Sequence, residues 1–388
     1  MEGAPRSRGY HTVLKVVHVI PGFYPAFIYG GPIESVYQLC RHLGQAGCEV
    51  RVLTTDADGP KTVLNVETSR EVEISPGLTV RYCHRILRHT VAPTLIRLLP
   101  YYIRQADLVH ITSVYSFSTI PTLLMCRIFG KPVVWSPRGS FQRWDGSRRI
   151  LSKGLWEKIC KSVAPKKMLL HTTSDWEARE SGERMPGINL AVIPNGVLLP
   201  ERVSRIGGNG VLRLLYLGRL HPIKGIENLL SACGILNEKY ERTWSLTIAG
   251  SGDPGYVKGL SERIRQLSLG GQVTLVGEVT GEAKEELFRH ADVLILPSFT
   301  ENFGLVVAEA LAHAVPVIAS TGTPWAELEK RGCGLWVDNS SEGLSEAISR
   351  MRHKALLEMG TRGRAWMKEE FGWETIAEKM LDTYRALV

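Results

Sequence analysis

Two glutamates separated by seven residues, Glu301 and Glu309, are the side chains of this sequence best placed to bind a polar ligand. The apolar run 292–297 predicts a buried strand. Glu301 then lies in the loop at the carboxyl end of that strand, where open parallel sheets bind their ligands. A helix is predicted over about 304–314, which places Glu309 roughly 7.5 Å further along the helix axis. These positions predict one site with a carboxylate at its mouth and a second carboxylate on its wall.

The residues between the two glutamates predict a helix N-terminus that can receive a ligand. The free N–H groups near Asn302, Phe303 and Gly304, just ahead of Leu305, can bind an anion or the oxygens of a sugar. Gly304 has no Cβ, so a ligand can approach the backbone closely. Glu309 lies among apolar residues, and a buried carboxylate needs a partner. We expect that partner to be a ligand.

Short apolar strands alternate with helical stretches along the chain, which is typical of parallel α/β domains. The expected strands cover 13–20, 49–55, 108–111, 133–136, 169–172, 191–194, 213–217, 245–249, 273–276, 292–297 and 315–319. The glycine-rich segment 201–211 contains few apolar residues and predicts a linker. We therefore predict a first domain over 1–200, a second domain over 212–370 and a final amphipathic helix within 371–388.

Glycine loops follow several of the strands expected in the first domain. They are Gly30-Gly31, Arg138-Gly139-Ser140 and Asn195-Gly196. Glycine at the carboxyl edge of a sheet exposes backbone amides to a ligand, although a glycine pair alone also makes an ordinary turn. Arg138 lies where its guanidinium can meet an anion.

The loop after the first strand of the second domain carries two cations. Gly218 is followed by Arg219, and Lys224 precedes the next helix. Arginine offers a planar fork to phosphate, and lysine offers a compact point charge. Together the two side chains can neutralise a leaving diphosphate without a metal ion.

Two further motifs carry weaker predictions. Residues 250–255 have the glycine spacing of a dinucleotide fingerprint, but Glu278, the nearest acid at the end of a strand, lies too far along the chain. We interpret Gly250 and Gly252 as another glycine loop at the ligand edge. The segment Asp56-Ala57-Asp58 can in principle hold a metal ion, but no further carboxylate or histidine cluster accompanies it, so a turn is favoured. We predict no metal and no cofactor.

Composition and charge narrow the class of protein. The 388 residues are 44% hydrophobic, and no stretch predicts a transmembrane helix. The net charge of +8 comes from the first 200 residues, which hold 25 Lys+Arg against 15 Asp+Glu. Nine of these cations lie within 138–167 and indicate an anionic membrane surface or a phosphorylated acceptor, although solvated helix faces explain them equally well. No nucleic-acid-binding motif accompanies them.

Two smaller features bear on location and packing. The seven scattered cysteines predict reduced thiols in a cytosolic protein. Segment 96–104 mixes apolar, aromatic and basic residues, and core packing is favoured over insertion into a membrane interface.

Taken together, these motifs resemble the retaining nucleotide-sugar glycosyltransferases of family 4, the glycosyl transferases group 1. The motifs that carry the resemblance are Glu301-x7-Glu309, Gly218-Arg219 with Lys224-Gly225, Gly30-Gly31 and Asn195-Gly196. The resemblance covers nearly the whole chain and implies the GT-B fold. In that α/β fold two Rossmann-like domains face each other across a cleft, and the C-terminal helix crosses back to the first domain. Many members carry His-Gly where this chain has Arg138-Gly139, and the arginine version resembles the exopolysaccharide and O-antigen branch.

The resemblance also implies roles for the residues of the second domain. Arg219 and Lys224 would bind the donor diphosphate and act in catalysis. Glu309 would bind the ribose hydroxyls. Glu301, with the backbone amides of residues 302–304, would hold the donor sugar.

The acceptor would bind the first domain. The candidate acceptor residues are Gly30, Gly31, Arg138, Gly139, Ser140 and Asn195; Gly31 would also close over the donor phosphates, and Arg138 is a further catalytic candidate. The implied reaction is metal-independent hexosyl transfer with retention, from a UDP- or GDP-linked sugar to a saccharide or lipid-linked oligosaccharide. This reaction would serve surface polysaccharide synthesis, in a cytoplasmic enzyme held at the inner face of a membrane through anionic lipid.

Three alternatives remain open at this point. A nucleotide-sugar epimerase shares the two-domain architecture and needs no acceptor groove. An NAD-dependent oxidoreductase would depend on the loop 250–255, which lacks its acidic partner. A non-enzymatic module that binds phosphate or nucleic acid would explain the basic first half but not Glu301 and Glu309.

Overall fold

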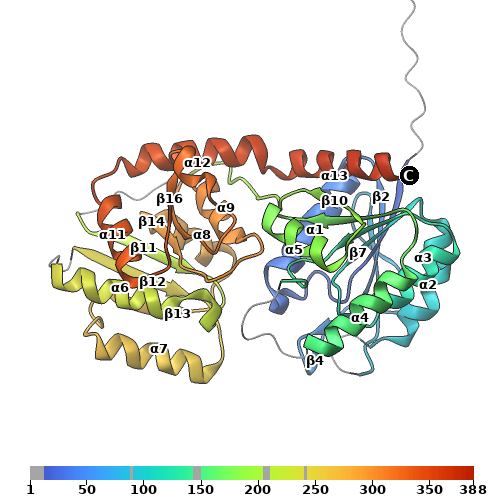
Figure 1. Ribbon diagram of the computed structural model, residues 1–388, viewed down its shortest axis with the longest axis horizontal. Helices are drawn as coiled ribbons and strands as arrows, with labels where there is room; N and C mark the ends of the chain where they lie inside the picture. Colours follow the sequence, from blue (N-terminus) through green and yellow to red (C-terminus); the bar gives the residue numbers. More distant parts are fainter. Residues whose placement is uncertain (1–12, 88–90, 143–149, 204–209, 240–242) are drawn as a thin grey trace, which may run out of the picture. The chain divides into compact units, whose positions relative to one another are not determined.

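The computed structural model describes residues 13–87, 91–142, 150–203, 210–239 and 243–388, and it divides into two compact units (Figure 1). The first unit comprises Met1–Thr172, Glu180–Ala191 and Ala377–Val388, and the second comprises Thr173–Arg179 and Val192–Ile376. Residues 192–200, predicted to end the first domain, thus belong with the second unit. The predicted linker is described only in part, because residues 204–209 lie outside the described ranges.

An eight-stranded sheet forms the centre of the first unit, in the order β10-β9-β8-β7-β1-β2-β6-β5. The strands are β1 Lys15–Val19, β2 Glu49–Thr55, β5 Val72–Ser75, β6 Leu78–Cys83, β7 Leu108–Thr112, β8 Val133–Ser136, β9 Met168–Thr172 and β10 Asn189–Val192. β1 pairs in parallel with both β2 and β7, whereas β5 pairs antiparallel with β6. The chain order reverses at β1, which creates a topological switch point between β1 and β7.

The first unit also contains several helical elements. They are η1 Phe27–Tyr29, α1 Gly31–Gln45, α2 Pro93–Gln105, α3 Thr119–Ile128, α4 Ile150–Val163, α5 Asp175–Arg184 and α13 Trp373–Leu387, of which α5 and α13 begin in the second unit. Leu99, Tyr102 and Ile103 of α2 are buried, which confirms the core packing predicted for segment 96–104.

Six parallel strands form the sheet of the second unit, in the order β13-β12-β11-β14-β15-β16. The strands are β11 Leu212–Leu217, β12 Trp244–Ala249, β13 Val273–Gly277, β14 Val293–Leu296, β15 Val317–Ser320 and β16 Gly334–Val337. Leu214 and Tyr216 enter one apolar cluster and Leu215 and Leu217 another, so β11 is covered on both faces. The order reverses between β11 and β14, which marks the ligand-binding edge.

The helical elements of the second unit are η2 Pro222–Lys224, α6 Ile226–Lys239, α7 Pro254–Gln266, α8 Gly281–His290, α9 Leu305–Ala312, α10 Glu327–Lys330, α11 Ser341–Met351 and α12 Leu356–Glu370. The two-unit α/β architecture with parallel sheets is therefore the one that the sequence predicts.

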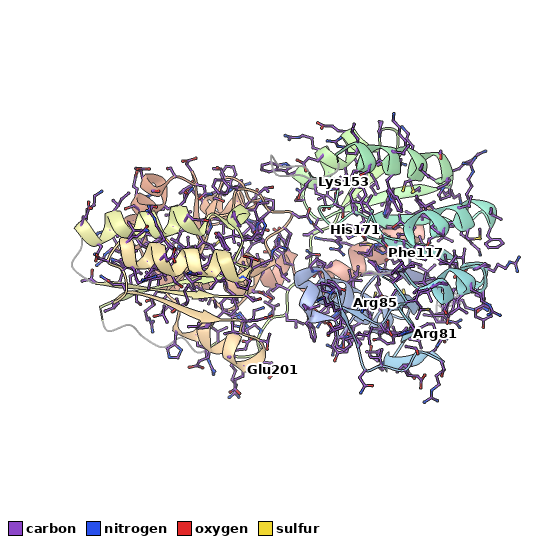
Figure 2. All side chains as sticks on the ribbon, turned by 90° about the horizontal axis from the view of Figure 1, so that it is seen from below. Arg81, Arg85, Phe117, Lys153, His171 and Glu201 are labelled. Atoms are coloured by element: carbon purple, nitrogen blue, oxygen red, sulfur yellow. The ribbon has the colours of Figure 1, made fainter. Side chains whose placement is uncertain are left out.

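Asp56-Ala57-Asp58 does not form the predicted turn, because Ala57 and Asp58 pair with a second short strand and the turn lies at residues 59–61. β3 Ala57–Asp58 pairs antiparallel with β4 Thr62–Val63 in a small hairpin. His84 Nδ1 lies 2.7 Å from Asp56 Oδ2, and the Arg85 N–H donates to Asp56 Oδ1 at 2.8 Å. Arg85, labelled in Figure 2, also donates to the carbonyls of Gly59 and Thr62. The carboxylate of Asp56 thus has hydrogen-bond partners within the protein.

The seven cysteines are free and buried, in agreement with the predicted thiols. Across the described ranges, none of the helices has the length and hydropathy to span a bilayer. The basic segment 138–167 includes Arg148 and Arg149, which lie outside the described residues.

Candidate active site

The loops that follow β11 and β14 meet at the carboxyl edge of the second sheet. The Phe299 N–H donates to the Ile223 carbonyl at 2.9 Å. A Cβ at Gly225, where φ is 64°, would lie 2.1 Å from the Pro297 carbonyl oxygen, so this approach requires glycine. The fold therefore joins two loops that are far apart in sequence, and each carries predicted site residues.

Lys224 and Glu301 form an ion pair between these loops. Lys224 Nζ donates to Glu301 Oε1, and the two side chains are 17% and 12% exposed. Ser298 Oγ donates to the same oxygen at 2.8 Å, and the Glu301 N–H donates to the Gly322 carbonyl at 3.0 Å. The Glu301 carboxylate is therefore held in one orientation, beside a cation, at the switch point.

Arg219 lies in the same loop as Lys224 and its side chain is exposed. Tyr216 Oη donates to the Arg219 carbonyl at 3.0 Å, which fixes the backbone there. Burial, followed by the positive charges of Arg219 and Lys224, lowers the pKa of His221. His221 Nδ1 accepts the Ile223 N–H at 3.2 Å. His221 is thus neutral and accepts a hydrogen bond within the loop. Arg219 and Lys224 are therefore the charged side chains of this loop.

Gly218, Gly250 and Gly252 let the loops after β11 and β12 pack backbone against backbone. A Cβ at Gly250 would lie 1.8 Å from the Gly218 oxygen, and one at Gly252 would lie 2.2 Å from the Leu220 oxygen. The Leu220 N–H donates to the Ser251 carbonyl at 2.8 Å. These contacts within the protein account for Gly250 and Gly252, the first two glycines of the 250–255 motif.

The start of α9 is held by residues on either side of it in the sequence. Asn302 Nδ2 donates to Thr173 Oγ1 at 2.8 Å, and its carbonyl accepts from Ser174 Oγ at 2.9 Å. The buried Phe303 accepts a hydrogen bond from Trp325 Nε1 on its carbonyl. Gly304 takes the left-handed conformation, with φ 75°, and Leu305 begins the helix. The sequence did not indicate that Thr173 and Ser174 support this turn.

Glu309 has a partner within the protein. Lys284 Nζ of α8 donates to Glu309 Oε1 at 2.6 Å, and the two side chains are 29% and 20% exposed. The sequence argument expected a ligand as the partner of Glu309 and missed this lysine, which α8 places beside α9. Both carboxylates of the Glu301-x7-Glu309 motif are thus held by lysines that are distant in sequence.

The predicted acceptor residues divide between the two units. Gly30, with φ 74°, precedes α1, and Gly31 is its first residue. Arg138 and Gly139 both have positive φ, at 51° and 76°, and the Ser140 N–H donates to the Pro137 carbonyl. Asn195 belongs to the second unit, where a Cβ at the next residue, Gly196, would lie 2.4 Å from the Trp373 ring. The structure therefore does not gather the predicted acceptor residues in one unit.

Two family models match consecutive parts of the chain. Residues 29–199 match the model described as Glycosyltransferase Family 4, and residues 208–365 match Glycosyl transferases group 1. Both are models of glycosyltransferases, and the two matches support a group 1 glycosyltransferase. Together the two models span nearly all of the described residues of both units.

Curated relatives share this family. An uncharacterised glycosyltransferase of Methanocaldococcus jannaschii is 31% identical over 178 residues, which is 44% of this chain and 44% of that protein. A D-inositol 3-phosphate glycosyltransferase of Streptomyces griseus is 31% identical over 44% of this chain and 38% of its own length. These alignments thus span less than half of each relative. The GDP-mannose:cellobiosyl-diphosphopolyprenol alpha-mannosyltransferase of Xanthomonas oryzae is 26% identical over 96% of both chains.

Solved structures identify the fold as GT-B, as the sequence predicts. Sucrose-phosphate synthase from Thermosynechococcus elongatus superposes with a TM-score of 0.73 at 22% identity, over 96% of this chain and 99% of that one. Anabaena HepE, solved with UDP and glucose, gives a TM-score of 0.72 at 17% identity, over 96% and 100%. At these identities the similarity concerns the architecture alone.

This glycosyltransferase also contains a buried histidine cluster that sequence reasoning missed. His18 and His110 are paired across β1 and β7, with ring centroids 4.3 Å apart. Ser136 Oγ lies 2.6 Å from His110 Nε2 and 2.7 Å from His171 Nδ1 (Figure 2 labels His171). Burial, with the charge of Arg138 next, lowers the pKa of His18 to about 3. His18 and His110 are therefore neutral, and with Ser136 and His171 they connect four adjacent strands, β1, β7, β8 and β9.

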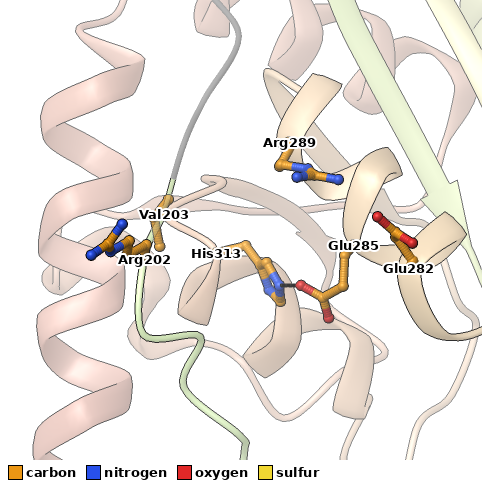
Figure 3. Close-up of a pocket in the computed structure, with 6 residues that line it drawn as sticks. All are labelled: Arg202, Val203, Glu282, Glu285, Arg289 and His313. Atoms are coloured by element: carbon orange, nitrogen blue, oxygen red, sulfur yellow. Dashed lines mark hydrogen bonds and ion pairs between the residues drawn. The ribbon is translucent and has the colours of Figure 1, made fainter.

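A surface pocket of the glycosyltransferase lies along α8, separate from the predicted site residues (Figure 3). Its volume is about 290 Å³, and it is lined by Arg202, Val203, Glu282, Glu285, Arg289 and His313. His313 Nε2 lies 2.5 Å from Glu285 Oε2, as Figure 3 shows, and His313 Nδ1 lies 2.7 Å from the Glu309 carbonyl oxygen. Two successive residues of α8 thus reach this part of the unit: Lys284 contacts Glu309 of α9, and Glu285 contacts His313, the residue that follows α9.

Proposed function

We propose that this glycosyltransferase moves a sugar from a nucleoside-diphosphate sugar to a saccharide acceptor, with retention at the anomeric carbon. The observation that carries the proposal is the Lys224–Glu301 ion pair beside the exposed Arg219, at the switch point of the second sheet. Cations at this edge suit a diphosphate, and the oriented carboxylate suits sugar hydroxyls. Neither a metal ion nor a cofactor is part of the proposal.

The relatives support a donor and an acceptor class. The name of the Xanthomonas relative gives GDP-mannose as donor and a polyprenol-linked disaccharide as acceptor, and HepE was solved with UDP and glucose. We therefore propose a UDP- or GDP-linked hexose as donor and a lipid-linked saccharide as acceptor, in surface polysaccharide synthesis. The enzyme would work from the cytoplasm at the inner face of the membrane, where the excess of cations in the first 200 residues favours anionic lipid.

The proposed reaction is a front-face displacement. The acceptor hydroxyl attacks the anomeric carbon from the side on which the diphosphate leaves. The bond from that carbon to the diphosphate oxygen breaks, its electron pair stays on the diphosphate, and the hydroxyl proton passes to the departing oxygen. Lys224 and Arg219 would stabilise the negative charge that develops there, and Glu301 would orient the sugar.

Because two cations would neutralise the leaving group, the transfer rate is expected to be unchanged in EDTA. Among the described residues there is no cluster of three or more His, Cys, Asp or Glu that could hold a metal ion. The measurement is the release of nucleoside diphosphate with and without chelator. Loss of the rate in EDTA, with recovery on addition of manganese, would contradict the proposed role of Arg219 and Lys224. It would direct attention to Asp56 instead.

Lys284→Met is expected to weaken nucleoside diphosphate binding about tenfold, because Glu309 loses the cation that orients its carboxylate toward the ribose. A nucleotide that lacks both ribose hydroxyls, such as 2′,3′-dideoxy-UDP or its guanosine counterpart, should bind the variant and the parent equally. The dissociation constants can be measured by calorimetry. An equal loss of affinity for both nucleotides would show that Lys284 acts on the fold and not through Glu309.

A further inference from the structure

α4 displays an apolar stripe to solvent. Leu151, Leu155 and Ile159 follow one another at a spacing of four residues and are 91%, 62% and 38% exposed. Residues at this spacing share one helix face. An amphipathic helix of a globular protein normally turns its apolar stripe toward the core. In α4 the stripe faces away from the core.

The charges around the stripe are positive. Lys158 and Lys161 are exposed on α4. Glu157, which is the only acid of this helix, is buried and accepts a hydrogen bond from Tyr115 Oη at 2.5 Å. The exposed face of α4 therefore combines apolar side chains and cations without an acid.

The opposite face of α4 fixes the helix to the first unit. Trp156 Nε1 donates to the Val114 carbonyl at 2.8 Å, and Cys160 is fully buried. Lys153 Nζ lies 5.1 Å from the centre of the Tyr115 ring. Because the inner face of α4 is packed against the first unit, the helix is fixed in this orientation. Its apolar stripe is therefore exposed in the folded protein.

α3 extends the same surface. It packs against α4, and Arg127 of α3 donates to the Ser162 carbonyl at the end of α4. Leu124 and Ile128 of α3 are 38% and 60% exposed. Figure 2 labels Phe117, just ahead of α3, and Lys153 of α4 on this part of the first unit. Apolar side chains of two neighbouring helices thus face solvent among cations.

We propose that this face of α3 and α4 docks on an anionic lipid bilayer, with Leu151, Leu155 and Ile159 inserted among the acyl chains. Lys158 and Lys161 would contact lipid phosphates. Amphipathic helices with lysine beside leucine bind membrane interfaces in this way. The inference rests on the proposed function for its partner, since a lipid-linked acceptor lies at such a surface.

The apolar stripe alters the expected salt dependence. Binding through cations alone would be largely lost near 0.5 M salt, where the Debye length falls below roughly 5 Å. Burial of apolar side chains is not screened by salt. Part of the binding should therefore persist at high salt, in contrast to a purely electrostatic attachment.

Co-sedimentation of the full chain with vesicles of phosphatidylglycerol and phosphatidylcholine tests this face. The double variant Leu151→Ser/Leu155→Ser should bind anionic vesicles at least about tenfold more weakly than the parent at both low and high salt. Lys158→Gln/Lys161→Gln should weaken binding at low salt and leave the high-salt remainder unchanged. Leu357→Ser, at a leucine of α12 that is 67% exposed, is the matched control and should bind like the parent.

Two results would overturn the inference. One is parent-like vesicle binding by the leucine variant. The other is a parent protein that does not bind vesicles but forms a dimer in analytical ultracentrifugation, while the leucine variant is monomeric. The stripe would then be an interface between two copies of the chain. Release of nucleoside diphosphate from a soluble donor, measured without vesicles, reports the proposed function separately. Vesicle binding without any release of nucleoside diphosphate would therefore support the proposed membrane-binding face and contradict the proposed glycosyl transfer.

Discussion

Lys224→Ala is expected to lower kcat about 10²–10³-fold, because the variant removes one of the two cations that would stabilise the leaving diphosphate. It also releases the Glu301 carboxylate from its ion pair, so the donor sugar loses an oriented partner. Arg219→Ala should lower kcat through the loss of charge alone. The measurement is the release of nucleoside diphosphate at saturating donor concentration.

Two further variants make the result specific. Lys258→Ala removes an exposed lysine of α7 that is 3.9 Å from Glu262, and it should leave kcat unchanged. The double variant Lys224→Ala/Glu301→Gln distinguishes two causes of a lower kcat. If the unpaired Glu301 carboxylate is the cause, the second substitution should restore part of kcat. If the missing lysine charge is the cause, it should not. A folded Lys224→Ala enzyme with the parent's kcat would remove Lys224 from the proposed mechanism.

Glu309→Ala is expected to raise the dissociation constant of the correct nucleoside diphosphate about 10²-fold. The proposed pair of hydrogen bonds from the ribose hydroxyls to this carboxylate would contribute about 1.5 kcal/mol each. Folding should change little, because Lys284 is 29% exposed and can turn to solvent. Calorimetric titration with UDP and GDP measures the binding, and the melting temperature reports the fold.

Glu262→Ala is the matched control for Glu309→Ala, since it removes an exposed glutamate of α7 that pairs only with Lys258 in the described structure. It should bind the nucleotide like the parent. If Glu309→Ala binds the nucleotide as tightly as this control, Glu309 has a structural role with Lys284 and does not contact the ribose.

The fold could be predicted because its strands are local patterns of buried apolar residues. β2 and β8 were predicted with the bounds that the structure has, and every side chain of β8 is buried. β10 was predicted over 191–194 but ends at Val192. Leu190 and Val192 are 40% and 43% exposed, so this edge strand lacks the buried run that would mark its ends.

The partners of the site residues could not be predicted, because they come from the packing of distant elements. Glu301 and Lys224 were both identified from their loops, but their ion pair depends on β11 and β14 being neighbours. Lys284 is an ordinary helix lysine in the sequence, and only the packing of α8 beside α9 makes it the partner of Glu309. His18 and His110 could have been found by aligning two apolar strands, each of which contains one histidine.

The unit to which Asn195 belongs also depends on distant contacts. The Val197 N–H donates to the Phe371 carbonyl at 2.8 Å, which joins this segment to the second unit. Strand and turn patterns carry no information about such a pairing. The prediction therefore extended the first domain to residue 200.

The most direct test of the account is to incubate the protein with a panel of nucleotide sugars and to measure the nucleoside diphosphate that is released. We predict release from UDP- or GDP-linked hexoses, a faster rate with a lipid-linked saccharide, and a product with the anomeric configuration of the donor by NMR. An epimerase would instead yield a rearranged free sugar. A folded protein that releases no nucleoside diphosphate from any donor of the panel, with or without acceptor, would contradict the proposed glycosyl transfer.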